Sequence, residues 1–193
     1  MLSVLMSLVE IRVHRGELAE AWRVLSLYDA IAGSQDVQDC AAYLSASAVV
    51  LRAECRHEEA LAAGVEGAVA GRAFGVASQP VKQGLVEATE SALALGLHDR
   101  AVELVDGIEA VPPGLRSPYL AAQAHRFRAR LGEPERFADA AAGFRELGVP
   151  FWLAVTLLEQ GEPAGIEEAR AIFERLGATP WLERAAMPVA EAS

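Results

Sequence analysis

The stretch RAIFERLGATPWLERA, residues 170–185, holds two amphipathic segments on either side of Gly-Ala-Thr-Pro. A glycine just past a helix end adopts the left-handed conformation without steric cost, and a proline fits the first helical turn because its missing N–H has no partner there. One helix is therefore expected to end at Gly177 and a short terminal helix, residues 179–190, to follow it. We expect the Thr179 hydroxyl to cap this second helix and Pro180 to begin it.

An internal repeat extends over the whole chain. Five segments carry a turn or capping signal directly before an amphipathic stretch, and they align on one small or aromatic residue. The aligned residues are Ala21, Ala60, Ala101, Phe137 and Ala169, spaced 32 to 41 residues apart. This uneven spacing predicts degenerate copies of one unit, a helical hairpin.

Apolar residues follow the period of helices rather than that of strands. Val37, Ala41, Leu44, Ala48 and Leu51 alternate steps of four and three, which places them on one helical face. The sequence thus predicts an all-α fold, a superhelical stack of about five antiparallel hairpins in a single domain, residues 1–193. The expected hairpins cover residues 1–33, 35–74, 78–111, 116–147 and 150–177, followed by the cap at 179–190.

The hairpins resemble degenerate tetratricopeptide repeats, because a small residue opens the second helix in four of the five units. More narrowly, FRELGVPFWLAVTLLEQGE, EEARAIFERLGATPWLERA and SQPVKQGLVEATESALALG resemble the C-terminal helical region of large bacterial regulators. In that family an adenylate or guanylate cyclase domain and an AAA-type ATPase domain precede the repeats. The family's cyclase and nucleotide-binding motifs have no counterpart here, so the resemblance implies a signalling scaffold without enzymatic activity.

Charge and hydropathy disfavour several classes of partner. The chain has a formal net charge of −10 and a pI near 4.9, so phosphate backbones and anionic membranes are expected to be repelled. The apolar N-terminus is too short to span a bilayer and has no basic residue before Arg12, so neither a signal peptide nor a membrane anchor is expected. We expect a cytoplasmic protein that binds neither nucleic acid nor membranes.

No residue pattern predicts catalysis, a cofactor or a metal site. The sole lysine, Lys82, lies outside any phosphate-binding loop, and HEEAL at His57 lacks the second histidine of a zinc motif. His57 and His98 occupy the same place in their repeats, which indicates a structural role at a helix entry or an exposed tip. We interpret Cys40 and Cys55 as small buried thiols in a reducing compartment.

Three glycines interrupt an otherwise helical run, and each costs about 1 kcal/mol relative to alanine. They are Gly64, Gly67 and Gly71. We expect a neighbouring helix to approach closely at the face of Gly64 and Gly71. A ligand pressed against the bare backbone is the alternative.

The first helix is apolar on two faces. Leu2, Leu5, Met6 and Val9 form one face, and Val4, Leu8 and Ile11 form the other. Large exposed apolar patches usually mark an interface. We therefore expect this helix to pack on a preceding repeat or on a second copy of the chain, through Leu2, Val4, Leu5 and Leu8.

Two functions are compatible with these features. The favoured one is a protein-interaction scaffold whose groove binds a protein, a peptide or another domain of a larger regulator. Candidate groove residues are Gln38, Tyr43, Lys82, Gln83 and Arg126. The alternative is a small-ligand sensor with an effector pocket between hairpins, near Trp22, Tyr28 or Trp152. We interpret the basic segment at residues 125–136, which includes Arg126 and Arg130, as a solvated face or, alternatively, as a contact for phosphate or an acidic peptide.

Overall fold

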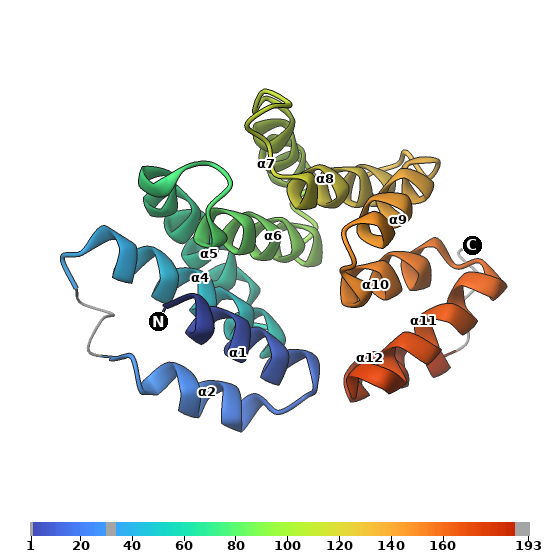
Figure 1. Ribbon diagram of the computed structural model, residues 1–193, viewed down its shortest axis with the longest axis horizontal. Helices are drawn as coiled ribbons and strands as arrows, with labels where there is room; N and C mark the ends of the chain where they lie inside the picture. Colours follow the sequence, from blue (N-terminus) through green and yellow to red (C-terminus); the bar gives the residue numbers. More distant parts are fainter. Residues whose placement is uncertain (1, 30–33, 188–193) are drawn as a thin grey trace. The chain divides into compact units, whose positions relative to one another are not determined.

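The computed structural model describes residues 2–29 and 34–187, and over these ranges the chain is helical and contains no strand (Figure 1). This confirms the all-α prediction. The helices are α1 (Leu2–His14), α2 (Leu18–Ser26), α4 (Val37–Ala53), α5 (His57–Gly71), α6 (Gln79–Ala94), α7 (His98–Glu109), α8 (Pro118–Arg130), α9 (Arg136–Glu146), α10 (Pro150–Gln160), α11 (Pro163–Leu176) and α12 (Thr179–Ala186). A short 3₁₀ helix, η1 (Arg72–Phe74), follows α5. Residues 1 and 30–33 of the first expected hairpin and residues 188–190 of the expected cap lie outside the described residues.

The helices group into two compact units. The first unit comprises residues 1–13 and 17–120, and thus α2, α4 to α7 and nearly all of α1. The second comprises residues 14–16 and 121–193, and thus most of α8 together with α9 to α12. Each unit buries apolar side chains of its own.

Some helix ends coincide with capping or helix-breaking residues of the sequence. Asp36 caps α4 by accepting a hydrogen bond from the Gln38 N–H at 2.8 Å. Gly177 ends α11 in the left-handed conformation, as expected. The prediction for Thr179 is wrong, because α12 already begins at that residue and Ala178, which has no capping side chain, stands before it. A hydroxyl inside the first turn no longer has the extended backbone from which a cap bonds the next N–H groups.

In the first unit, one face of α1 packs against α2 and α4. Leu5, Met6 and Val9 are at most 1% exposed and share a core cluster with Leu25 of α2 and Val49 of α4. This face of α1 is therefore covered within the chain.

Helices α4, α5 and α6 contact one another, and glycines allow the close approach (Figure 1). A Cβ atom built on Gly64 would lie 2.7 Å from the carbonyl oxygen of Gly84, and one built on Gly84 would lie 2.5 Å from the carbonyl oxygen of Gly64. A Cβ on Gly67 would collide with Ser45 of α4, and one on Gly71 would crowd the start of α6. The predicted approach of a neighbouring helix at Gly64 and Gly71 is confirmed.

Helices α4 and α6 run in the same direction. The Ser45 hydroxyl donates to the carbonyl oxygen of Pro80 at 3.0 Å, and Nε of Arg52 donates to Oε2 of Glu87 at 2.5 Å. Both contacts join residues 35 positions apart. A constant offset along two packed helices requires that they be parallel.

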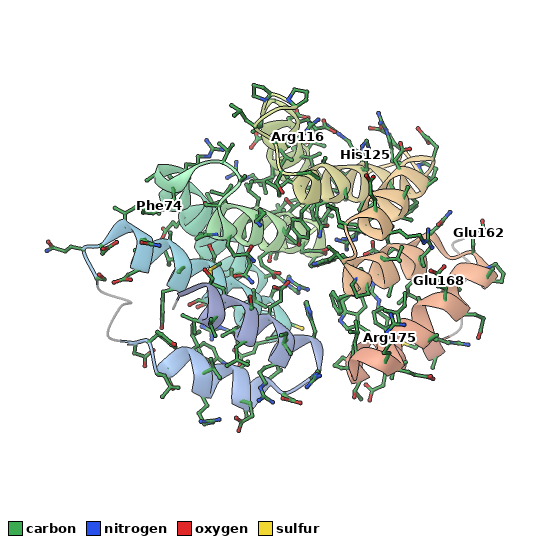
Figure 2. The ribbon with its side chains drawn as sticks, in the orientation of Figure 1. Phe74, Arg116, His125, Glu162, Glu168 and Arg175 are labelled. Atoms are coloured by element: carbon green, nitrogen blue, oxygen red, sulfur yellow. The ribbon has the colours of Figure 1, made fainter. Side chains whose placement is uncertain are left out.

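Aromatic rings form the core of the second unit. Phe151 and Trp152 of α10 meet edge to face at 5.3 Å, and Phe151 lies 5.5 Å from Trp181 of α12. Phe173 of α11 stacks on Trp181 at 5.7 Å. These contacts attach the short helix α12 to α10 and α11. The exposed surface of this unit carries charged side chains, among them Glu162, Glu168 and Arg175 (Figure 2).

The residues that align the repeat are all buried. Ala21, Ala60, Ala101 and Ala169 have no exposed surface, and Phe137 is 8% exposed. The first three are each the fourth residue of their helix, in α2, α5 and α7. The sequence alignment therefore identifies buried positions that are equivalent in at least three helices.

The cysteines correct a prediction. Cys40 is partly exposed and Cys55 is exposed, so the two are not buried thiols. Cys55 has a φ of +60° in the turn between α4 and α5, and Gly96, with a φ of +69°, occupies the corresponding turn between α6 and α7. A turn residue lies outside the packed helix faces, which explains the exposure of Cys55.

Candidate functional site

Buried polar side chains are concentrated on α4, α6, α8 and α10. Within the described ranges they are Ser45 and Ser47 on α4, Gln83, Glu87, Thr89 and Ser91 on α6, Gln123 and Arg126 on α8, Thr156 on α10, and Ser117 directly before α8. Helices α5, α7, α9 and α11, in contrast, add no polar side chain to this set. The polar interior is thus a property of alternate helices, and it forms the candidate site.

In the first unit, α1, α4 and α6 contribute one polar cluster. Glu87 is 1% exposed and pairs with Arg52, whose Nε and Nη2 lie 2.5 and 3.5 Å from its two carboxylate oxygens. Nε2 of Gln83, one turn before Glu87, donates to Oε2 of Glu10 at 3.4 Å. Two carboxylates, one amide and one guanidinium therefore meet in this interior.

The carboxyl group of Glu10 titrates far from its ordinary range. Burial, and next the negative charge of Glu87, raise the pKa of Glu10 from 4.5 to about 7. The Arg52 guanidinium, the hydrogen bond from Gln83 and the Lys82 ammonium act in the opposite direction and are weaker. Glu10 thus exists in both protonation states around neutral pH.

In the second unit, Arg126 is the centre of the polar cluster. It is 1% exposed and binds Glu159 of α10 through two hydrogen bonds of 2.6 and 2.7 Å. Its Nη1 donates to Oε1 of Gln123 at 3.1 Å, and its guanidinium lies 4.8 Å from the ring centroid of Trp152. A bidentate arginine–carboxylate pair whose guanidinium lies over an aromatic ring is a strong stabilising interaction. The expectation of a solvated face is therefore wrong for Arg126.

The predicted groove residues divide into two groups. Gln38 is exposed, and Tyr43 and Lys82 are partly buried, with the Tyr43 hydroxyl 3.0 Å from Oδ1 of Asp29. Gln83 and Arg126 are 4% and 1% exposed, so they face the protein interior.

Sequence reasoning missed the residues that bind these buried groups. They are Glu10, Arg52, Glu87 and Glu159. One available signal was the pair Gln83 and Glu87, four residues apart and hence on one face of a helix that is otherwise mostly apolar or small.

The residues predicted for self-association also divide. Leu5 is 1% exposed and belongs to the core, whereas Val4 is 66% exposed and Leu8 is partly buried. The side chain of Leu2 lies outside the described part of the chain. Val4 and Ile11, which is 48% exposed, remain on the outer face of α1.

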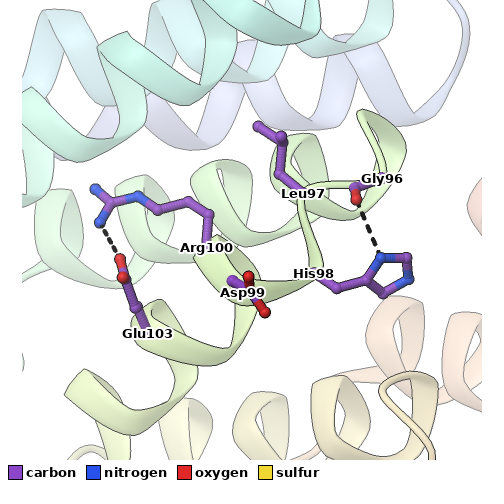
Figure 3. Close-up of a pocket in the computed structure, with 6 residues that line it drawn as sticks. All are labelled: Gly96, Leu97, His98, Asp99, Arg100 and Glu103. Atoms are coloured by element: carbon purple, nitrogen blue, oxygen red, sulfur yellow. Dashed lines mark hydrogen bonds and ion pairs between the residues drawn. The ribbon is translucent and has the colours of Figure 1, made fainter.

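Two surface depressions lie at helix turns. One, of about 510 Å³, is lined by Gly96, Leu97, His98, Asp99, Arg100 and Glu103 (Figure 3). The other, of about 280 Å³, is lined by Cys55, Arg56, His57, Glu58, Glu59 and Leu95. His57 and His98 are the first residues of α5 and α7, as the sequence indicates. Ligand sites are usually lined by apolar side chains with a few polar groups, whereas four of the six residues that line each depression are charged residues or histidine.

The depression at residues 96–103 is held by local interactions. Nδ1 of His98 lies 3.0 Å from the carbonyl oxygen of Gly96, and Arg100 donates to Glu103 at 2.7 Å (Figure 3). Among the residues that the structure describes, no group of three or more His, Cys, Asp or Glu side chains is placed to hold a metal ion.

Comparisons of the chain with protein-family models, with curated proteins and with solved structures give no match in any of the three. Within residues 2–29 and 34–187, no helix combines the length and the apolar character needed to cross a bilayer.

Proposed function

We propose that the chain is a non-catalytic, tetratricopeptide-like scaffold that binds a protein or peptide partner. The observation that carries the proposal is the parallel packing of α4 and α6 through contacts 35 residues apart, with α5 in contact with both. Hairpins stacked side by side produce this arrangement, and such repeat arrays offer extended surfaces for binding. The sequence resemblance adds the proposal that the chain is the C-terminal repeat region, or a shortened relative, of a cyclase- and ATPase-type cytoplasmic regulator.

The partner surface is expected where α4 and α6 remain accessible. Gln83 and Arg126 are engaged inside the protein, which leaves Gln38, Tyr43 and Lys82 as the predicted contact residues. Gln38 and Lys82 lie in the first turns of α4 and α6, two helices that pack against each other. One extended partner segment is therefore proposed to contact both helices.

Site-specific photo-crosslinking in living cells tests this surface. A photoreactive phenylalanine replaces Gln38 or Lys82 in the full chain, and Glu66 of α5 or Glu103 of α7, both exposed, in two control variants. The proposal predicts one adduct of the same mass at the first two positions and none at the controls, and Tyr43→Ala should reduce that adduct. Equal labelling at all four positions, or none at any, would refute the scaffold surface.

The competing proposal is a small-ligand sensor. The depression at residues 96–103 has a volume within the range of known ligand sites, which is the observation in its favour. A thermal-shift screen against metabolites separates the two functions. A reproducible rise in melting temperature with one metabolite, abolished by Arg100→Ala, would favour the sensor.

A further inference from the structure

The side-chain amide of Gln83 on α6 makes a hydrogen bond through its nitrogen, whereas its oxygen is buried and has no partner among the residues that the structure describes. Nε2 donates to Oε2 of Glu10 on α1 at 3.4 Å. Oε1 is buried and accepts no hydrogen bond from residues 2–29 and 34–187, and the whole residue is 4% exposed. Buried hydrogen-bond acceptors without a donor are rare in folded proteins, so a donor to Oε1 of Gln83 is expected nearby.

Among the charged groups of this cluster, the carboxyl group of Glu10 is the candidate source of that donor. Glu87 on the same face of α6 is an acceptor and is engaged by Arg52 from α4. Lys82, the residue before Gln83 on α6, acts on Glu10 through its charge. A protonated Glu10 gains an O–H group on one carboxyl oxygen, which can donate to Oε1 of Gln83 while the other carboxyl oxygen continues to accept from Nε2.

We propose that Glu10, Gln83 and Glu87 form a proton-binding site that fastens α1 to α6, and that loss of the proton weakens the packing of α1. The protonated state supplies the missing donor and removes one of two negative charges from a shared interior. The ionised state provides no donor for Oε1 of Gln83, and it places the negative charge of Glu10 where the negative charge of Glu87 repels it. This inference does not depend on the proposed partner-binding function.

The direction of the pH effect follows from the raised pKa of Glu10, which is about 7 in the folded chain against an ordinary value of 4.5. Between these two values the folded chain binds more protons than the unfolded chain, so the proton stabilises the fold at low pH. This stabilisation decreases as the pH rises from 4.5 and is lost above about 7. For opening of α1 alone, the same two pKa values imply that protection falls about tenfold between pH 6 and pH 8.

Two measurements on the full chain test the proposal. The first is a ¹³C NMR titration of the Glu10 carboxyl, assigned by triple-resonance experiments, with an expected midpoint near 7. The second is the amide-exchange protection factor of α1, corrected for the intrinsic pH dependence of exchange. It should fall about tenfold from pH 6 to pH 8 in the wild type and in the exposed-surface control Glu66→Gln, and stay flat in Glu10→Gln.

Either measurement can overturn the inference. A carboxyl midpoint near 4.5 would show that Glu10 does not hold a proton at neutral pH. An unchanged pH response of α1 in Glu10→Gln would assign the response to other groups. If Glu10→Gln does not fold, the titration of the wild-type carboxyl alone decides.

Discussion

Gly64→Ala is expected to destabilise the first unit although alanine is the better helix former. The added methyl carbon would lie 2.7 Å from the carbonyl oxygen of Gly84 and 3.0 Å from the backbone nitrogen of Ala88. Both atoms belong to the backbone of α6, so no side-chain rotation relieves the contact. The two helices must separate instead.

The expected loss is about 2 kcal/mol. Overpacking a tightly packed core costs about 1–3 kcal/mol, and the rigid backbone contact favours the upper end. The higher helix propensity of alanine offsets about 1 kcal/mol of this cost. The difference remains destabilising.

Urea unfolding followed by circular dichroism gives the free energy, and hydrogen exchange of α5 and α6 locates the change. Gly107→Ala is the matched control, because Gly107 lies inside α7 with no atom within 4 Å of the added methyl. That variant should gain up to about 1 kcal/mol. A Gly64→Ala protein as stable as the wild type would refute the backbone contact between α5 and α6.

Two further substitutions test local features. Cys55→Gly should stabilise the chain by about 1 kcal/mol in urea unfolding, because a left-handed conformation is costly for any residue with a Cβ. For the same reason Gly96→Ala should lower the stability by a similar amount. A Cys55→Gly protein that is less stable than the wild type would contradict this. Glu159→Leu should lower stability by about 3 kcal/mol, because it removes the carboxylate that accepts two hydrogen bonds from the buried Arg126 guanidinium. Arg126→Met in the same chain should recover most of the loss, and a double variant no more stable than the single one would argue against a buried ion pair.

Helix positions were largely predictable from local chemistry. Glycine and proline act on their own residue and its immediate neighbours, so Gly177 and Pro180 identify the boundary between α11 and α12 from sequence alone. The cap at Thr179 was not predictable, because a shift of one residue decides whether a hydroxyl precedes a helix or lies inside it.

The close approach at Gly64 was predictable because a helical glycine is costly unless packing compensates it. Its counterpart Gly84 was not recognised, since a single glycine in α6 gives no indication of which helix faces it. The contact became evident only when the two backbones were placed together.

The polar interior was predictable only in part. Gln83 and Arg126 were recognised as polar residues of a candidate groove, but the sequence did not show that their side chains point into the protein interior. Their partners Glu10 and Glu159 lie 73 and 33 residues away, and helical periodicity within one segment cannot specify contacts over such separations. Buried charge is also uncommon, so a solvated face was the natural expectation for Arg126.

Helices α5 and α6 meet backbone to backbone, and the central proposal is that helices of neighbouring hairpins stack in this way through small residues. A double-mutant cycle of Gly64→Ala and Gly84→Ala measures this directly, because each methyl would press on the other glycine's carbonyl oxygen. Once the first methyl separates the helices, the second finds room, so the combined loss should be at least about 1 kcal/mol smaller than the two single losses added together. Strict additivity would contradict the contact and the stacked arrangement built on it.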